Sequence, residues 1–124
     1  AWLISGGRVL RDGRIEPGEV TLAEGRIAAS APGARRFDAA GLLVMPGLVD
    51  IHGDAHERQM QPRPGIGFPA RLAMRDSASQ LLAAGITTAF LGVTLSWEPG
   101  LRGIETWRAT LAAVEAVRPR AGCD

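Results

Sequence analysis

Two side chains that can bind a metal ion, His52 and Asp54, stand two residues apart in the segment Pro46–Asp54. They follow Leu48–Ile51, a short and mostly apolar stretch that is typical of a buried strand. In a parallel barrel, ligands and catalytic groups collect at the carboxyl ends of the strands. Imidazole and carboxylate suit divalent zinc, manganese or iron. If the chain leaves the strand at Gly53, both side chains can face one site, and we interpret them as ligands of one divalent metal ion.

The same spacing also has a plainer structural interpretation. Asp54 could accept backbone hydrogen bonds in a turn, and His52 could be a polar residue whose hydrogen bonds are satisfied locally. The spacing alone favours this second interpretation, so the neighbouring residues have to decide between the two.

Those neighbouring residues favour the metal ligands. The run Val-Met-Pro46-Gly-Leu-Val-Asp-Ile-His52 resembles the P-G-L-[VI]-D-x-H-x-[HD] motif of the amidohydrolase superfamily. In that superfamily the motif marks the first barrel strand, directly after an N-terminal β-sandwich portion, and the residues at the positions of His52 and Asp54 bind the metal. Most members carry His at the second of these two ligand positions, so the Asp at position 54 narrows the range of subfamilies that the chain resembles.

Residues further along the chain are similar to one branch of the superfamily. The branch is the diphosphatases of phosphonate catabolism, and the similar segments are His52–Asp54, the Pro62-Arg63-Pro64 loop and Ala84–Thr88. The resemblance spans nearly the whole chain, most strongly Pro46–Thr88, and covers only the first part of such an enzyme. It implies a small phosphorylated sugar as substrate, α-D-ribose 1-methylphosphonate 5-triphosphate, cleaved to the 5-phosphate and diphosphate.

Two arginines of the proline-rich loop are candidates for binding the phosphates. Arg63 lies between two prolines, which restrict the backbone and lower the cost of ordering its guanidinium. A planar guanidinium can hold two phosphate oxygens at once. Arg58 lies on the same loop and could share the charge of a triphosphate. The alternatives are that Arg63 is a solvated charge or packs on Phe68.

The resemblance places the remaining functional groups outside this chain. Further metal ligands and an Asp acting in proton transfer come from later strands of such enzymes, so we expect no catalytic residue here beyond the two ligands. We expect His56 and Glu57 to be surface loop residues, and the three Trp residues to be packing residues. The chain alone is expected to be an inactive N-terminal fragment that self-associates.

Other functions stay open at this point. A different amidohydrolase would cleave a cyclic amide or deaminate a base. A chain that is truncated, degenerate or completed by a partner would be a non-catalytic fragment or an assembly module.

The elements around the site indicate an α/β protein in two parts. Over residues 1–46, short strands and tight turns at Asp12-Gly13, Pro17-Gly18 and Glu24-Gly25 predict an antiparallel β-sandwich portion. Over 47–124 we expect strand, helix, strand, helix, the first two β/α units of a TIM-like (β/α)8 barrel.

The helices of the second part have sequence signals of their own. Ser77 with Gln80 forms a capping box before one helix, and Gly85 stands where that helix should end. Ile104–Val117 has the period of the other helix. The stretch Ala55–Phe68 is too rich in proline for a helix. A third strand is expected to begin near Arg118.

Composition excludes several classes of protein. The chain has 124 residues with 14 basic and 13 acidic side chains, a net charge of +1, so no strong field favours nucleic acid or a membrane surface. A single cysteine fits a reducing compartment, and we expect a cytoplasmic protein without signal peptide. The uncharged run Ala39–Val49 is interrupted by Gly41, Pro46 and Gly47, whereas a membrane helix needs roughly 20 apolar residues.

Overall fold

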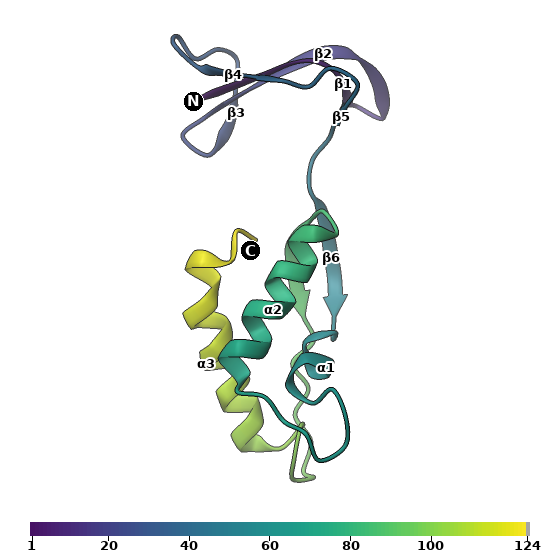
Figure 1. Ribbon diagram of the computed structural model, residues 1–124, viewed down its shortest axis with the longest axis vertical. Helices are drawn as coiled ribbons and strands as arrows, with labels where there is room; N and C mark the ends of the chain where they lie inside the picture. The colour runs from purple at the N-terminus through teal and green to yellow at the C-terminus, as the bar shows by residue number, and fades with distance from the viewer. Residues whose placement is uncertain (124) are drawn as a thin grey trace. The chain divides into compact units, whose positions relative to one another are not determined.

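The structure is a computed structural model that describes residues 1–123. It divides into two compact units, Ala1–Pro46 and Gly47–Asp124, which are described separately below (Figure 1). Within residues 1–123, no helix is both long and apolar enough to cross a membrane.

The first unit is built on a hairpin of β1 (Trp2–Arg11) and β2 (Arg14–Ala23). Asp12 and Gly13 join the strands with φ values of 50° and 74°, the left-handed pair that a type I′ turn requires. The expected turn at Asp12-Gly13 is therefore confirmed. The turn expected at Pro17-Gly18 is wrong, because both residues lie inside β2 and pair with β1.

The other three strands complete one five-stranded sheet. They are β3 (Arg26–Ala28), β4 (Arg35–Asp38) and β5 (Leu43–Val44). β3 pairs antiparallel with β2, whereas β4 and β5 both pair parallel with β1. The expectation of a wholly antiparallel layer is thus wrong, and the unit is a single sheet rather than two packed sheets. After β3 the chain crosses to the far edge of β1, where the N–H of Arg35 donates to the Ala1 carbonyl at 3.2 Å, and this crossover makes the pairing parallel.

The second unit follows the expected order of strand, helix, strand, helix. Its elements are β6 (Leu48–Gly53), α1 (His56–Met60), α2 (Ala70–Ala83), β7 (Ile86–Leu91) and α3 (Ile104–Ala121). β6 and β7 pair parallel, with Leu48 beside Ile86 and Gly53 beside Leu91, and α2 connects them (Figure 1). The predicted parallel pairing of these two strands is confirmed. Two strands alone do not test the predicted barrel.

Three local expectations for this unit are wrong. The prolines at 62 and 64 follow α1 rather than interrupt it, so one helical turn forms before them. Ser77 is not a cap, because α2 begins at Ala70 and the Ser77 hydroxyl donates to the Ala73 carbonyl inside the helix. No strand begins at Arg118 or in the described residues after it, because α3 continues through Pro119 to Ala121 and is capped by Gly122, whose φ is 75°.

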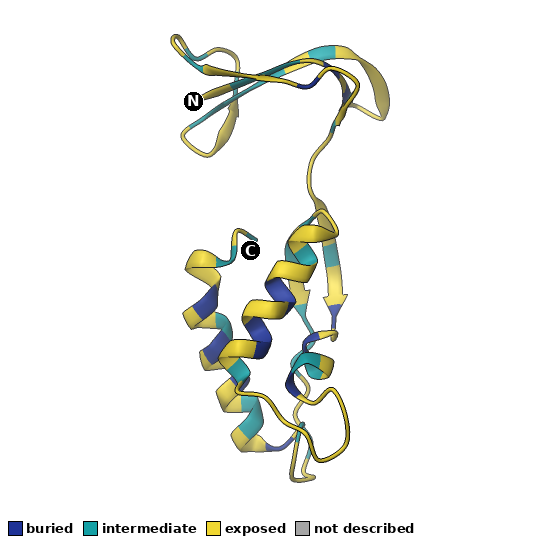
Figure 2. Ribbon diagram, in the orientation of Figure 1, coloured by how far each residue is buried: buried dark blue, intermediate teal, exposed yellow. Residues whose placement is uncertain are grey.

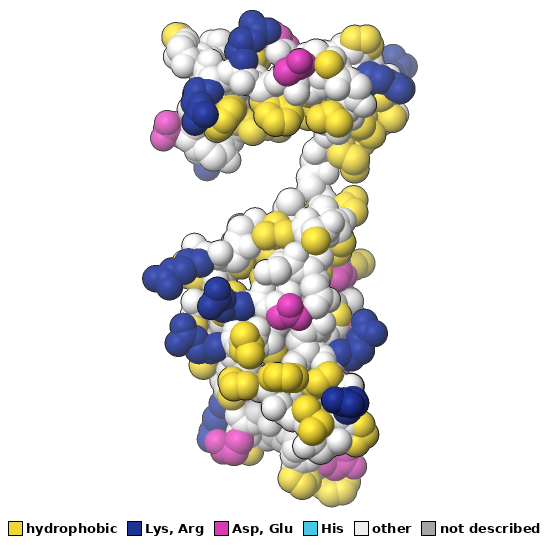
Figure 3. All heavy atoms as spheres, in the orientation of Figure 1, with side chains coloured by type: hydrophobic (Ala, Val, Ile, Leu, Met, Phe, Trp, Pro, Cys, Tyr) yellow, Lys and Arg dark blue, Asp and Glu magenta, His cyan; other side chains and the backbone are white. Residues whose placement is uncertain are grey.

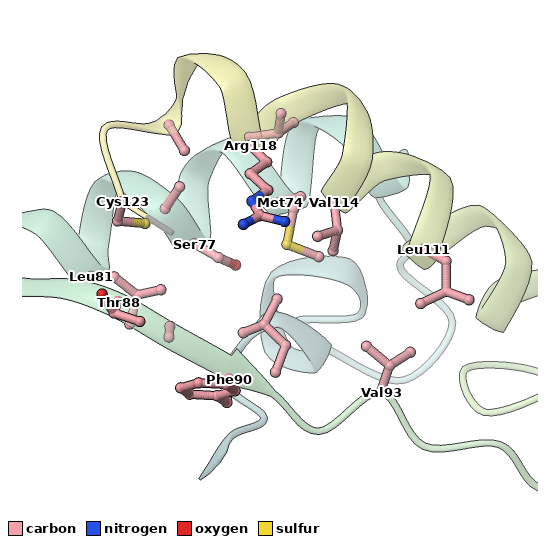
Figure 4. A pocket seen from close by; sticks show the side chains of 15 residues that line it. Met74, Ser77, Leu81, Thr88, Phe90, Val93, Leu111, Val114, Arg118 and Cys123 are labelled. Atoms are coloured by element: carbon pink, nitrogen blue, oxygen red, sulfur yellow. The ribbon is translucent and has the colours of Figure 1, made fainter. Parts of the chain in front are cut away.

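A small core holds the two long helices together. Its buried residues are Met74 and Ala78 from α2 and Ala113 and Val117 from α3. Beside this core, α2, α3 and β7 enclose an open and mostly apolar groove of about 380 Å³ (Figure 4). The core is therefore centred on α2–α3 packing.

The parallel strands carry apolar side chains that the described chain leaves uncovered. Ile51 is 81% exposed, and Val49 and Phe90 are exposed as well. Figure 2 shows exposed stretches, in yellow, along β6. A parallel pair is normally covered on both faces. Exposed apolar surface of this kind favours association, but self-association stays a prediction.

Candidate metal centre

His52 lies at the carboxyl end of β6, with an exposed side chain that reaches Gly92, the residue after β7. Its ring occupies the space that a side chain on Gly92 would need, since a Cβ there would come within 2.9 Å of the His52 Cε1. The Gly92 N–H donates to the Gly53 carbonyl at 2.9 Å and extends the strand pairing to this point. Gly92 therefore lets the imidazole lie across the ends of both strands.

The side chain of Asp50 accepts a hydrogen bond and makes contacts at the end of β6, next to His52, a role that the sequence did not reveal. Its Oδ1 accepts a hydrogen bond from the His52 backbone N–H at 3.1 Å. Its other oxygen, Oδ2, lies where a Cβ on Gly53 would be, at 2.8 Å. Any larger residue at position 53 would displace this carboxylate, so Gly53 is needed for the local geometry.

Asp54 follows directly and is exposed. Its backbone carbonyl accepts from the Glu57 N–H at 3.0 Å at the start of α1. Between residues 1 and 123, no hydrogen bond or ion pair engages its carboxylate. The side chain is therefore not the turn-forming acceptor of the plainer interpretation.

The chemistry of this pair fits a divalent cation. An exposed imidazole and an unengaged carboxylate stand at one strand end, and both are common ligands of zinc or manganese. However, no three His, Cys, Asp or Glu side chains among residues 1–123 are grouped so that they could hold a metal ion. This segment can contribute two ligands, and a catalytic zinc site usually has three from protein.

The expectation that His56 is a surface residue is wrong. The side chain is only 2% exposed, and its Nδ1 has no hydrogen-bond partner within the described chain. Burial lowers the pKa of His56, against the charges of Glu57 and Asp54, which raise it. α1 buries this face of its single turn together with Met60, whose sulfur accepts a hydrogen bond from Thr110 of α3. His56 is therefore a buried residue of α1 and not a residue of a surface loop.

Glu57 is also not a free surface residue. Its two carboxylate oxygens accept hydrogen bonds from Arg102 Nε and Nη2 at 3.0 and 2.8 Å. The Glu57 side chain is 17% exposed and that of Arg102 is 52% exposed. The hydrogen bond and charge of Glu57 raise the pKa of Arg102. This Glu57–Arg102 clasp joins the segment after β6 to the segment after β7.

Neutralising the clasp should loosen both segments. In Glu57→Gln, faster amide hydrogen exchange is expected in residues 56–60 and 94–103, because the bidentate pair that joins them is lost. Hydrogen-exchange mass spectrometry measures this, and the charge-swapped double variant Glu57→Arg/Arg102→Glu should restore part of the protection. The matched control is Glu105→Gln, which breaks the more exposed Arg108–Glu105 pair and should change little. Equal exchange in Glu57→Gln and the unmodified chain would contradict the role of the clasp.

Arg58 and Arg63 have exposed and unpartnered side chains. Arg58 lies in the last turn of α1. Arg63 begins a tight turn in which its carbonyl accepts from the Ile66 N–H at 3.0 Å, and the Phe68 N–H closes the loop by donating to the Met60 carbonyl at 2.8 Å. Neither guanidinium forms an ion pair, and none stacks on Phe68, anywhere in residues 1–123. The structure therefore leaves both free to bind an anion, and phosphate binding stays a prediction.

One of the three tryptophans is not a packing residue. Trp97 is 92% exposed, on a loop closed by a hydrogen bond from the Ser96 N–H to the Arg102 carbonyl at 2.8 Å. This loop follows β7, so an aromatic side chain stands on the same group of loops as the clasp.

Known proteins resemble this chain in sequence and in fold over most of its length. No family model matches. The α-D-ribose 1-methylphosphonate 5-triphosphate diphosphatase of Escherichia coli (strain K12) is 26% identical over 123 residues, which are 95% of this chain and 32% of that protein. An allantoinase of Rubrobacter xylanophilus is 36% identical over 121 residues, which are 92% of this chain and 24% of that protein.

Solved structures agree on the fold. An amidohydrolase from a Sargasso Sea environmental sample superposes with a TM-score of 0.62 at 18% identity, over 94% of this chain and 31% of that one. A D-hydantoinase from Bacillus sp. AR9 gives 0.58 at 21% identity, over 99% and 32%. The chain thus spans about a quarter to a third of these proteins' lengths. The relatives are hydrolases of the amidohydrolase superfamily, and the predicted resemblance is confirmed.

Proposed function

We propose that this chain, which resembles part of the amidohydrolase-superfamily enzymes in sequence and fold, supplies two metal ligands to a metal-dependent hydrolase. The ligands are His52 and Asp54. The observation that carries the proposal is their exposure at the carboxyl end of β6, the first of two parallel strands, with the imidazole seated over Gly92 and the Asp54 carboxylate unengaged.

The proposed reaction is hydrolysis of a phosphoanhydride in a ribose triphosphate, with release of diphosphate, as part of phosphonate catabolism. His52 and Asp54 would hold the divalent metal ion, which would polarise a phosphoryl oxygen of the substrate and lower the pKa of a bound water. Asp50 positions His52 at the end of β6 by accepting a hydrogen bond from the His52 backbone N–H. Arg58 and Arg63 bind the negative charge of the triphosphate, since both guanidinium groups are exposed and free to do so. The name of the E. coli relative supports this substrate class.

A second candidate is hydrolysis of a cyclic amide. The allantoinase relative has the higher identity, 36% against 26%, and a D-hydantoinase shares the fold. The same metal ligands serve both reactions, because a metal ion polarises an amide carbonyl as it does a phosphoryl oxygen. The two candidates differ at the arginines, which would be solvated charges in a cyclic amidase.

Arg63→Ala in the full-length enzyme separates the candidates. We expect the KM for the ribose triphosphate to rise by about tenfold or more, because a charge-assisted hydrogen bond to phosphate is lost. Steady-state assays of diphosphate release measure this, with Arg26→Ala as control, an exposed arginine in β3. Hydrolysis of allantoin or a hydantoin without any diphosphate release would reject the phosphoanhydride reaction and favour the cyclic amidase.

A further inference from the structure

A second polar feature of the molecule lies on the helices, away from the strand ends. A groove of about 260 Å³ runs between α2 and α3. Three arginines line it together with small apolar side chains. They are Arg71 and Arg75 from α2 and Arg120 from α3. Figure 3 shows dark-blue side chains gathered over these two helices.

Among residues 1–123, no carboxylate pairs with the positive charges of this groove. Arg71 and Arg75 are one helical turn apart, so they share a face of α2 and repel each other. None of the three forms an ion pair within residues 1–123, whereas Arg102 and Arg108 both do. Asp76, the acidic neighbour of Arg75 in sequence, instead accepts a hydrogen bond from Gln80 at 2.7 Å. The groove therefore has three like charges, and the described part of the chain provides no carboxylate partner for them.

The floor of the groove is apolar. Ala78 and Val117 are buried there, and Ala121 is partly buried. The one hydroxyl in the lining, Ser79, already donates its proton to the Arg75 carbonyl at 3.0 Å. All donors for a ligand thus come from the guanidinium groups at the rim, and an anion on this floor would be partly shielded from water, which strengthens its attraction to them.

We propose that this groove binds the phosphate groups of a small soluble anion. Planar guanidinium groups match two phosphate oxygens each, and three of them around one groove suit a ligand with several negative charges, such as a diphosphate. The proposal does not depend on the proposed reaction, because it uses none of the residues of the candidate metal centre.

Calorimetric titration of the full chain with inorganic diphosphate tests the proposal. We expect binding that weakens about tenfold in Arg75→Gln and about a hundredfold or more in Arg71→Gln/Arg75→Gln/Arg120→Gln, since each step removes charge-assisted hydrogen bonds. The matched control is Arg108→Gln, an arginine of α3 that is paired with Glu105 outside the groove. It should leave the affinity unchanged.

Two further titrations distinguish a small soluble phosphate from other anionic ligands. Vesicles of phosphatidylglycerol and an oligoglutamate peptide are titrated against the same variants. Tighter binding of either one than of diphosphate, lost in the triple variant, would assign the groove to a membrane or to an acidic protein and overturn the proposal. No binding of diphosphate, or equal weakening in Arg108→Gln and Arg75→Gln, would overturn it as well.

Discussion

Replacing His52 or Asp54 by alanine in the full-length protein is expected to reduce turnover strongly and to lower the amount of bound metal. Each variant removes one of the two proposed ligands at the end of β6, and no hydrogen bond or ion pair within the described residues engages the Asp54 carboxylate. A metal ion contributes several kcal/mol to transition-state stabilisation, so the rate should fall by roughly three orders of magnitude. Metal content after dialysis, measured by inductively coupled plasma mass spectrometry, should fall together with the rate.

Two control variants make this result specific. Asp76→Ala removes an exposed carboxylate from α2, and His56→Phe replaces the buried ring by an apolar one of similar shape. The Nδ1 of His56 has no partner, so its loss leaves no acceptor or donor unsatisfied. Both controls should retain metal and activity. Full metal content and full rate in both His52→Ala and Asp54→Ala would refute the metal site.

A substitution that adds only one methyl group, Gly47→Ala, should destabilise the second unit by roughly 1–3 kcal/mol. A Cβ on Gly47 would overlap the Thr87 side chain, including the Thr87 Cβ itself. No change of rotamer moves a Cβ, so the strands β6 and β7 would have to separate where the Leu48 N–H donates to the Gly85 carbonyl at 2.9 Å. Urea unfolding of the chain measures the change in free energy.

A second substitution, at Thr87, should recover the stability that Gly47→Ala loses. Thr87→Gly in the Gly47→Ala background removes the overlapping side chain and should recover most of the loss, apart from the added freedom of a glycine in a strand. Gly67→Ala is the matched control, because a Cβ there meets only the Met60 carbonyl at 3.9 Å. Equal stability of Gly47→Ala and Gly67→Ala would show that the strands do not approach as closely as described.

Sequence reasoning succeeded where a signal lies within a few residues. The turn at Asp12-Gly13 follows from the left-handed backbone that these residues tolerate. The parallel pairing of β6 and β7 follows from two apolar strands separated by a helical segment. Gly85 was expected at the end of α2, and it follows the helix there with a φ of 79°.

It failed where the deciding contact is distant in the sequence. Nothing local to Glu57 reveals Arg102, its partner 45 residues later. Sequence alone presents His56 as a polar loop residue, whereas it is buried in the structure, where α1 packs against α2. The parallel addition of β4 and β5 to β1 depends on the path of the crossover, which strand propensity does not encode. The same limit applies to the arginine groove, because its charges come from two separate helices.

Because Trp97 is exposed, its intrinsic fluorescence can report on changes in its surroundings. An indole in water emits at longer wavelength than one in apolar surroundings, and Trp97 is far more exposed than Trp2 or Trp107. Its loop is closed at Arg102, which also binds Glu57, so the environment of this indole is linked to the segment that follows β6. Any ligand that settles on these loops and excludes water from the indole will shift its emission to the blue. Occupancy of the strand ends can therefore be followed by fluorescence without attaching a dye.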